Sequence, residues 1–350
     1  MPRAPSHSTL TPPARAGAPA ATPMAFVRAV VAAYERHAVD PSAALRQARI
    51  APRELRLHDG RITASQFEAL CAHAMQELDD EALAWFSRRL PWGSYGLLIR
   101  ASVTAPDLGV ALRRWSRHHR LLADDVLLHL HIDGDAATLR LEETRPIAPA
   151  VRELCLVTLL RYVHGFACWA IDSRIALRGA SFALPEPRHA EVYALLFGCP
   201  LAFDAPVTAM RFDARYLALP LVRDEAATRA MLQQALALTV RQYRRDRLLA
   251  QQVREHLRQR PVATAETVAA ALNLSARTLH RQLREEGSSL QSLKDEARFA
   301  LAQGLLRQTA RSIAQVARAA GFRNEKSFAR AFTAWSGLPP GRWRQASAGH

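Results

Sequence analysis

The sequence predicts an α+β N-terminal part, residues 24–240, followed by an all-α part with two helix-turn-helix units, residues 248–350. Apolar residues from position 264 onward keep helical spacing and recur as a repeat. The preceding part mixes helical stripes with short alternating runs, which favour strands. The first 23 residues contain six prolines and no apolar segment, so residues 1–23 are expected to form a disordered tail.

In the α+β part, the clearest local signal is an alternating pattern on both sides of a turn. Residues 126–132 and 137–142 alternate around Asp133-Gly134-Asp135, which predicts a β-hairpin. The short apolar run at residues 95–103 favours a strand. The other expected elements are a helical region at 24–87, helices at 108–122, 149–171 and 189–197, strands at 175–184 and 207–212, and a charged helical connector at 221–260. We therefore expect a modest antiparallel sheet with helices packed on it.

The first helix-turn-helix unit begins with a short Ala-rich helix that ends at Leu272 and breaks at Asn273. A second helix is expected to start at Ser275, a favoured N-cap residue. It carries Leu279 and Leu283 four positions apart, which places both on one buried face. The side chains expected on the opposite face are Arg277, Thr278, His280 and Arg281.

The same pattern returns further along the chain. Val268, Ala269, Asn273 and Leu274 recur 48 positions on as Val316, Ala317, Gly321 and Phe322, and Leu279, Arg281 and Leu283 recur 49 positions on as Phe328, Arg330 and Phe332. The turn residues, Asn273 and Gly321, are the types that best tolerate a left-handed backbone. Ala269 and Ala317 are small where two helices must cross closely. A repeated helical core alone would not explain both turn residues together with a basic outer face.

A single helix is expected to join the two units. Ser288 to Gln291 fits a capping box, and the helix can run from about Leu290 to Leu306. At 1.5 Å per residue this helix is about 25 Å long, so the two outward helices could lie about 34 Å apart, which is one turn of DNA. A second capping box, Ser312 to Gln315, opens the first helix of the second unit.

The charge balance favours a polyanionic partner. The net charge is +15 and the pI about 10.9, and residues 248–350 hold 16 Lys and Arg against 7 Asp and Glu. An Arg-rich composition could raise the pI of any protein, so the charge counts as support only because it falls on the outer faces of the two second helices.

Composition also limits the compartment. The four cysteines, Cys71, Cys155, Cys168 and Cys199, show neither C-x-x-C pairing nor zinc spacing and suit a reducing cytosol. No apolar run of membrane length is present, because residues 154–171 are interrupted by Arg161 and His164. We expect a cytoplasmic protein with no membrane association.

Four segments of residues 248–350 resemble the DNA-binding domain of the AraC/XylS transcription regulators. They are Leu272-Asn-Leu-Ser275-Ala-Arg277-Thr-Leu279-His-Arg281, Arg298-Phe-Ala-Leu-Ala302-Gln-Gly-Leu305-Leu306, Gly321-Phe322 with Ser327-Phe328-Ala-Arg330-Ala-Phe332, and Gly337 with Pro340-Gly-Arg-Trp343-Arg344. The sequence departs from the family at residues 323–326, Arg-Asn-Glu-Lys, where a Ser-Asp pair is usual; Asn324 can still cap the helix. The resemblance implies transcription regulation, more often activation, and contact with RNA polymerase.

The N-terminal part resembles the arabinose-binding-type regulatory domain that accompanies some of these regulators. The resemblance lies in Trp92-Gly-Ser94-Tyr95-Gly-Leu, in Asp124-Asp125, and in Leu196-Phe197-Gly198-Cys-Pro200-Leu-Ala-Phe203. It implies that residues 24–240 bind an unknown small-molecule effector or form a homodimer, and that double-stranded DNA is bound by residues 248–350.

The candidate DNA-binding residues are Arg277, Thr278, His280, Arg281, Asn324, Lys326, Ser327 and Arg330. For base reading we favour Arg277, His280 and Arg281 in the first unit and Lys326, Ser327 and Arg330 in the second, since arginine can donate two hydrogen bonds to guanine O6 and N7. Thr278, Asn324 and Glu325 could instead contact phosphate, cap their helices or recognise cytosine. Arg298 lies on the joining helix and is interpreted as a structural residue that holds the two units together.

Other site chemistry finds little support. No catalytic motif and no cofactor signature is present, so we expect neither an enzyme nor a bound cofactor. His129 and His131 share one face of a strand but lack further metal ligands nearby, and no metal site is predicted. Trp92 and Tyr95 could line an effector pocket, although aromatic packing is the commoner role. Two alternatives stay open: a DNA-repair enzyme that uses this module, with Cys199 as its reactive thiol, and a nonspecific architectural DNA-binding protein.

Overall fold

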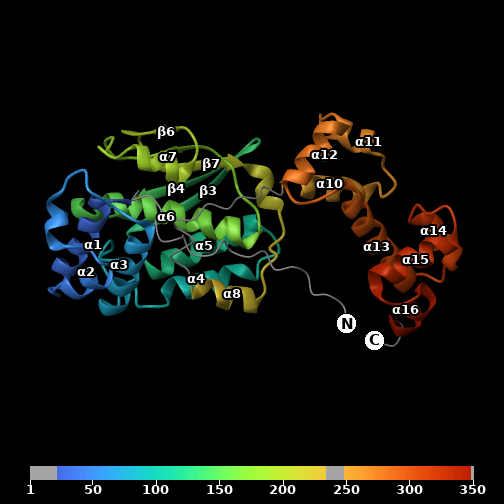
Figure 1. The fold of residues 1–350 in the computed structure, drawn as a ribbon, viewed down its shortest axis with the longest axis horizontal. Helices are drawn as coiled ribbons and strands as arrows, with labels where there is room; N and C mark the ends of the chain where they lie inside the picture. The colour runs from blue at the N-terminus through green and yellow to red at the C-terminus, as the bar shows by residue number, and fades with distance from the viewer. Residues whose placement is uncertain (1–21, 234–247, 348–350) are drawn as a thin grey trace. The chain divides into compact units, whose positions relative to one another are not determined.

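The computed structural model describes residues 22–233 and 248–347 (Figure 1). The chain divides into two compact units, Met1–Tyr243 and Arg244–His350, which we call the N-terminal lobe and the C-terminal lobe. Most of the expected tail lies outside the described residues. Its last two residues, Thr22–Pro23, form strand β1, which pairs antiparallel with β2 (Arg61–Ile62).

The start of the N-terminal lobe is helical, as the apolar stripes predict. Its elements are α1 (Met24–Arg36), α2 (Ser42–Gln47), the 3-10 helix η1 (Pro52–Arg56) and α3 (Ala64–Glu77). Helix α1 buries Phe26, Val30 and Tyr34 along one stripe and packs against α3 and α6. Thr63 caps α3, since its side chain accepts a hydrogen bond from the backbone N–H of Gln66.

A five-stranded sheet forms the centre of this lobe, in the order β3-β4-β7-β5-β6. Its strands are β3 (Val126–Asp133), β4 (Ala136–Glu143), β5 (Leu177–Ser181), β6 (Leu201–Ala202) and β7 (Thr208–Asp213). The predicted hairpin is confirmed: β3 and β4 pair from Val126–Glu143 to Asp133–Ala136, and Gly134 takes the positive φ of 55° that the tight turn requires. The strands pair antiparallel except β5 and β6, which are parallel.

Helices cover one face of the sheet. Leu128, Leu139 and Leu141 are buried, whereas the alternate residues His129 and Arg140 are partly exposed. Helix α5 (Leu108–Leu122) packs against β3, and α6 (Pro149–Ala170) packs against β7 and α5. The lobe also contains α7 (Glu191–Phe197), the 3-10 helix η2 (Ala214–Ala218) and α8 (Glu225–Leu232). The predicted α+β class is therefore confirmed.

The strand expected at residues 95–103 is wrong, because this run is helix α4 (Ser94–Val103). Its buried residues are Tyr95, Gly96, Leu98, Ile99 and Ser102, and the spacing of three and four from Tyr95 to Leu98 and Ile99 and on to Ser102 is helical. Gly93 provides the N-cap with φ 100°. Helix α4 packs against α5 and α8, while Leu97 and Arg100 remain exposed.

The charged connector expected at residues 221–260 is only partly described. Helix α8 and helix α10 (Leu248–Gln259) fall within it, and residues 221–224 are not helical. The arginine cluster Arg241, Arg244, Arg245 and Arg247 lies outside the described residues. In the part of the chain that the structure describes, none of the helices has the length and apolar content needed to cross a membrane.

The C-terminal lobe is all helical, as predicted. After α10 its helices are α11 (Ala265–Ala271), α12 (Ala276–Glu285), α13 (Leu290–Gln308), α14 (Ile313–Ala319), α15 (Glu325–Ser336) and α16 (Pro340–Ser347). Two helix-turn-helix motifs, α11–α12 and α14–α15, are joined by α13 (Figure 1).

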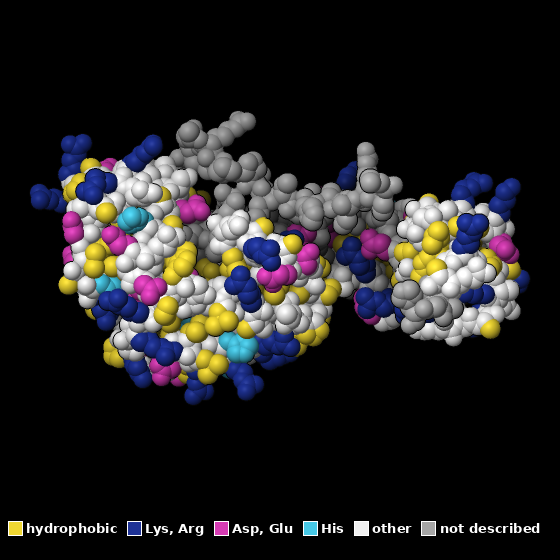
Figure 2. All heavy atoms as spheres, turned by 90° about the horizontal axis from the view of Figure 1, so that it is seen from below, with side chains coloured by type: hydrophobic (Ala, Val, Ile, Leu, Met, Phe, Trp, Pro, Cys, Tyr) yellow, Lys and Arg dark blue, Asp and Glu magenta, His cyan; other side chains and the backbone are white. Residues whose placement is uncertain are grey.

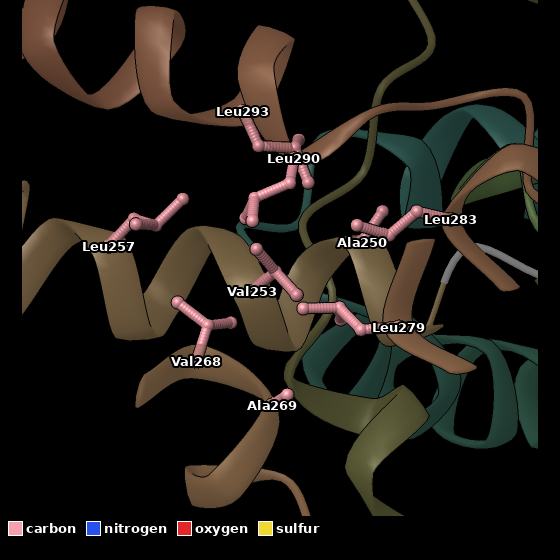
Figure 3. Close-up of a cluster of buried hydrophobic side chains, with 9 residues drawn as sticks. All are labelled: Ala250, Val253, Leu257, Val268, Ala269, Leu279, Leu283, Leu290 and Leu293. Carbon is pink, nitrogen blue, oxygen red and sulfur yellow. The ribbon is translucent and has the colours of Figure 1, made fainter. Parts of the chain in front are cut away.

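Each motif has its own hydrophobic core. In the first core, residues of α10 lie between Val268 and Leu279 of the motif on one side and Leu290 and Leu293 of α13 on the other (Figure 3). The second core consists of Ala302, Leu306, Val316, Ala317, Ala320, Phe328 and Phe332. Phe299 and Trp343 pack against it from α13 and α16. Helix α13 therefore contributes to both cores.

The capping box that opens α13 lies one residue later than the sequence suggested. Ser289, not Ser288, is the N-cap, and its Oγ accepts from the backbone N–H of Ser292 at 3.1 Å. Ser288 ends the preceding helix, because its N–H donates to Leu283 O at 2.8 Å while Gly287 has φ 71°. These bonds form a Schellman motif at the end of α12. Because Ser288 belongs to this motif, the next helix is capped one residue later, by Ser289.

Candidate nucleic-acid interface

The turns of the two motifs have the same backbone geometry. Asn273 has φ 56° and Gly321 has φ 79°, so the predicted left-handed turns are confirmed. In both turns the following N–H reaches back five residues: Leu274 N–H donates to Ala269 O, and Phe322 N–H donates to Ala317 O, each at 2.9 Å. These bonds fix the angle at which the second helix leaves the first.

A capping side chain sets the start of each second helix. Ser275 Oγ accepts from Thr278 N–H at 3.1 Å, and Asn324 Oδ1 accepts from Ser327 N–H at 2.8 Å. The caps are 49 positions apart and the turn residues 48 apart, so the second motif has the predicted extra residue between turn and helix. Asn324 therefore preserves the cap where the sequence departs from the family pattern.

Helix α12 separates an apolar face from a basic one. Leu279 and Leu283 are fully buried, whereas Arg277, His280 and Arg281 are exposed. Thr278 is only partly exposed, and its hydroxyl lies 2.8 Å from Ser275 Oγ. Thr278 is thus part of the cap, while the other three side chains are available to a ligand along the helix.

Helix α15 repeats this division with larger apolar residues. Phe328 and Phe332 are fully buried, and Phe322 packs edge-to-face on Phe328 with ring centroids 5.5 Å apart. The remaining candidates, Asn324, Lys326, Ser327 and Arg330, are all exposed around the first turns of the helix. Asn324 is committed to capping through its side-chain oxygen.

Two features of this surface were missed from the sequence. Arg281 Nη1 is ion-paired with Glu285 Oε1 at 2.8 Å, so an acidic residue already holds one of the candidate arginines. Arg284 and Arg323 are exposed next to the candidate residues on α12 and before α15, and only their charge marked them. Figure 2 shows several Lys and Arg side chains (dark blue) on the surface of this lobe and fewer Asp and Glu.

The two histidines that were considered as metal ligands both lie on strand β3. His129 and His131 stack with ring centroids 6.1 Å apart, and His129 Nε2 lies 2.8 Å from Glu142 Oε2. Among the described residues, no group of three His, Cys, Asp or Glu side chains is placed to hold a metal ion.

Trp92, which precedes α4, and Tyr95, which lies in α4, differ in burial. Tyr95 is buried and packs on Tyr162 with ring centroids 4.7 Å apart, whereas half of Trp92 is exposed. Their packing offers no support for the effector pocket considered from the sequence.

Comparison with known proteins identifies both lobes. The family model "Arabinose-binding domain of AraC transcription regulator, N-term" matches residues 39–221, and a helix-turn-helix domain model matches residues 268–346. An ornithine utilization regulator of Pseudomonas aeruginosa is 28% identical over 327 residues, which cover 93% of this chain and 96% of that protein. Transcriptional activator NphR of a Rhodococcus species is 35% identical over 85 residues, or 24% of this chain and 25% of that protein.

Among solved structures, the transcriptional regulator CdpR from Pseudomonas aeruginosa is 20% identical, covers 89% of this chain and 98% of that chain, and has a TM-score of 0.32. The DNA-binding domain of AdpA, solved with a target DNA, is 31% identical, covers 28% of this chain and 90% of that chain, and has a TM-score of 0.25. Because the arabinose-binding model matches residues 39–221, more than half of the chain, the protein belongs to the AraC/XylS family of transcription regulators, with an N-terminal ligand-binding domain and a C-terminal helix-turn-helix DNA-binding domain.

Proposed function

We propose that this regulator activates transcription by inserting α12 and α15 into two successive major grooves of one DNA duplex. The observation that carries the proposal is the shared geometry of the two motifs. Each second helix follows a left-handed turn residue, is capped by a side chain, buries two apolar residues and exposes basic ones. A positively charged, outward-facing helix of this kind matches the shape and charge of a major groove.

The proposed base-reading residues are Arg277, His280 and Arg281 in the first motif and Lys326, Ser327 and Arg330 in the second. All six are exposed on the helices that would enter the grooves. Thr278 and Asn324 lie at the starts of α12 and α15, where phosphate contacts are expected.

Residues 24–240, which fall within the N-terminal lobe, are proposed to receive the signal. Binding of a small-molecule effector or formation of a homodimer there changes how the two helices engage DNA, and so changes contact with RNA polymerase. We place the protein in the cytoplasm, where promoter DNA and polymerase are found. The family assignment of the lobe as ligand-binding supports the effector, whereas the dimer and the polymerase contact follow from family membership alone.

Ornithine is the first effector to test, because the ornithine utilization regulator aligns with 93% of this chain. A ligand at 100 times its Kd stabilises its binding domain by about 2.7 kcal/mol, which a thermal melt detects. Norvaline, which lacks only the δ-amine, is the matched control. A shift with ornithine and none with norvaline assigns the effector, and equal behaviour of the two rejects it.

The experiment that tests the proposed function is selection of genomic DNA by the purified full-length protein, repeated across a salt series. The expected result is a motif with two short conserved blocks about one helical turn, ~34 Å, apart. Recovery of no motif, with binding that only fades as salt rises, would make the protein a nonspecific architectural DNA-binding protein.

The DNA-repair alternative depends on a reactive cysteine, and the local chemistry opposes it. Burial raises the pKa of the Cys199 thiol above its ordinary value, which lowers the thiolate fraction. Cys71 and Cys155 are fully buried, and burial raises the pKa of both thiols. We therefore propose a regulator without catalytic activity. Exposure to alkylated DNA should leave the intact protein mass unchanged.

A further inference from the structure

The first part of helix α13 packs in the core of the first motif, and the part after Arg298 packs in the core of the second. Leu290, Leu293 and Ala297 pack in or against the first core. Phe299 packs against the second core, in which Ala302 is buried. Arg298 lies between these two sets, halfway along the helix that joins the motifs.

The side chain of Arg298 contacts the turn of the second motif. Its guanidinium carbon lies 5.4 Å from the centroid of the Phe322 ring, within cation–π range. Its Nη2 atom lies 3.7 Å from the position that a Cβ on Gly321 would occupy. Nε of Arg298 is buried and has no hydrogen-bond partner among the described residues.

A residue that lies just before the first motif also contacts the turn of the second motif. Val262, from the loop between α10 and α11, places its Cγ1 where a Cβ on residue 321 would lie. Glycine at 321 therefore serves two needs, since it adopts φ 79° and admits Val262. An ion pair between Arg254 Nε and Glu296 Oε2, at 2.8 Å, ties α10 to α13 nearby.

The contacted turn is the part of the second motif that orients α15. The Phe322 ring packs edge-to-face on Phe328, with centroids 5.5 Å apart, and at a tilt on Trp335, with centroids 6.0 Å apart; both of these residues belong to α15. A displacement of the turn relative to α13 would therefore carry α15 with it. The orientation of α12 is fixed separately, through Leu279 and Leu283 in the first core.

We propose that Arg298, together with Val262, is a positioning residue that fixes the distance and rotation between α12 and α15, and thereby sets the number of base pairs that the protein accepts between its two DNA blocks. This inference rests on the proposed function, because it assumes that both helices read DNA. One added base pair rotates the second block by about 35° and moves it by about 3.4 Å. A rigidly held pair of helices cannot follow that change, whereas a loosened pair can.

The first test measures spacing preference with the full-length protein. The variants are Arg298→Ala and, as a matched control, Arg307→Ala, which removes an exposed arginine from the same helix. The DNAs are the selected two-block site, the same site with one base pair added or removed, and a single block. For wild type and Arg307→Ala we expect the altered spacings to weaken binding about tenfold or more.

For Arg298→Ala we expect that penalty to fall to about threefold or less, with single-block binding within about twofold of wild type. An unchanged spacing penalty would overturn the proposal. Equal weakening on every DNA would also overturn it, because it would mark Arg298 as a phosphate contact or as a residue needed only for stability.

A second test needs no DNA. Spin labels are placed at Ala271→Cys and Ala319→Cys, two exposed and equivalent positions in the first helices of the motifs. The background carries Cys199→Ser, because the other three cysteines are buried. We expect a narrow distance distribution that broadens with Arg298→Ala and stays narrow with Arg307→Ala. Equal widths in all three proteins would overturn the proposal. If selection yields no two-block motif, the proposed function fails, and the label distances still decide whether Arg298 fixes the motifs.

Discussion

Asn273 and Gly321 hold equivalent places 48 positions apart, and both have a positive φ, 56° and 79°. The two residues satisfy this backbone in different surroundings. Asn273 is exposed, whereas Gly321 is partly buried under Val262 and Arg298. Asparagine is sufficient where only the conformation matters, and glycine is required where another chain segment also approaches.

Substitution of the two turn residues should separate these effects. Asn273→Gly should leave stability almost unchanged, and Asn273→Ala should cost about 1 kcal/mol because alanine disfavours the left-handed region. Gly321→Ala should cost more than Asn273→Ala, since its Cβ also meets Val262. Hydrogen exchange of α11–α12 and α14–α15 in the full chain measures each motif separately. Equal costs at the two turns would contradict this reasoning.

The turn and cap positions could be predicted from the sequence because their causes are local. Asn273, Gly321, Ser275 and Asn324 act through their own backbone preference or through a side chain that reaches three residues ahead. The hairpin at Gly134 was predictable for the same reason. Such signals need no knowledge of what packs nearby.

The parts that escaped prediction depend on neighbours elsewhere in the chain. Helix α4 was mistaken for a strand because periodicity alone does not separate a short apolar helix from a buried strand. The stacking of Arg298 on Phe322 joins residues 24 positions apart, so no local pattern encoded its geometry. The two-residue strands β1 and β6 are too short to show alternation.

Substitution of Arg223 should destabilise the N-terminal lobe far more than substitution of a surface arginine. Its Nη2 lies 2.5 Å from Asp172 Oδ1, its Nε donates to Trp169 O at 2.7 Å, and its guanidinium stacks over the Trp169 ring at 5.5 Å. Arg223→Ala removes a partner of a carboxylate that is 7% exposed, which should cost about 3–5 kcal/mol. The stability of Arg223→Lys should fall between those of wild type and Arg223→Ala, because lysine loses the planar stacking on Trp169. Thermal and urea unfolding measure both.

The control for that substitution is Arg229→Ala, which breaks a 4.0 Å pair with Glu225 at the surface. This loss should stay within about 0.5 kcal/mol. Similar costs for Arg223→Ala and Arg229→Ala would show that burial of the Asp172 pair is not what matters.

Acid should destabilise the N-terminal lobe partly through His119. Burial lowers the pKa of its imidazole from 6.5 to about 4. The unfolded chain binds a proton below pH 6.5, but the folded lobe does not until about pH 4, so the free energy of unfolding falls as the pH drops through this window. The loss from this residue should reach about 3 kcal/mol. Burial also lowers the pKa of His164, to about 3, so His164 adds a loss of the same sign.

His119→Leu should flatten this pH dependence by about one proton between pH 6.5 and 4. Neither ring nitrogen of His119 has a hydrogen-bond partner among the described residues, so leucine sacrifices no such bond. Unfolding in urea at several pH values gives the slope. His58→Leu, at an exposed position, is the control. An unaltered slope in His119→Leu would show that this histidine is not the titrating group.

Glu285 should restrain DNA binding through its ion pair with Arg281. Glu285→Gln removes that competitor and should strengthen binding to the selected site about twofold, since an i,i+4 pair is worth about 0.3–0.5 kcal/mol. Glu255→Gln, which breaks the comparable surface pair with Arg258 on α10, controls for removal of one negative charge. An equal gain in both variants would show that net charge, not release of Arg281, is responsible.

Arg281→Ala and Arg330→Ala should each relax base preference in one DNA block while nonspecific binding persists. Both arginines are exposed and stand 49 positions apart at equivalent sites, so each should affect only the block that its own helix contacts. A bidentate contact to guanine is worth about 1–3 kcal/mol, so discrimination at the affected position should fall by about tenfold or more. Selection with each variant measures base preference block by block, and a salt series on random DNA measures the phosphate contribution. If a variant weakens specific and random DNA equally and lowers the salt slope by about one, that arginine binds phosphate, and the base must be read by a neighbour such as Arg277 or Lys326.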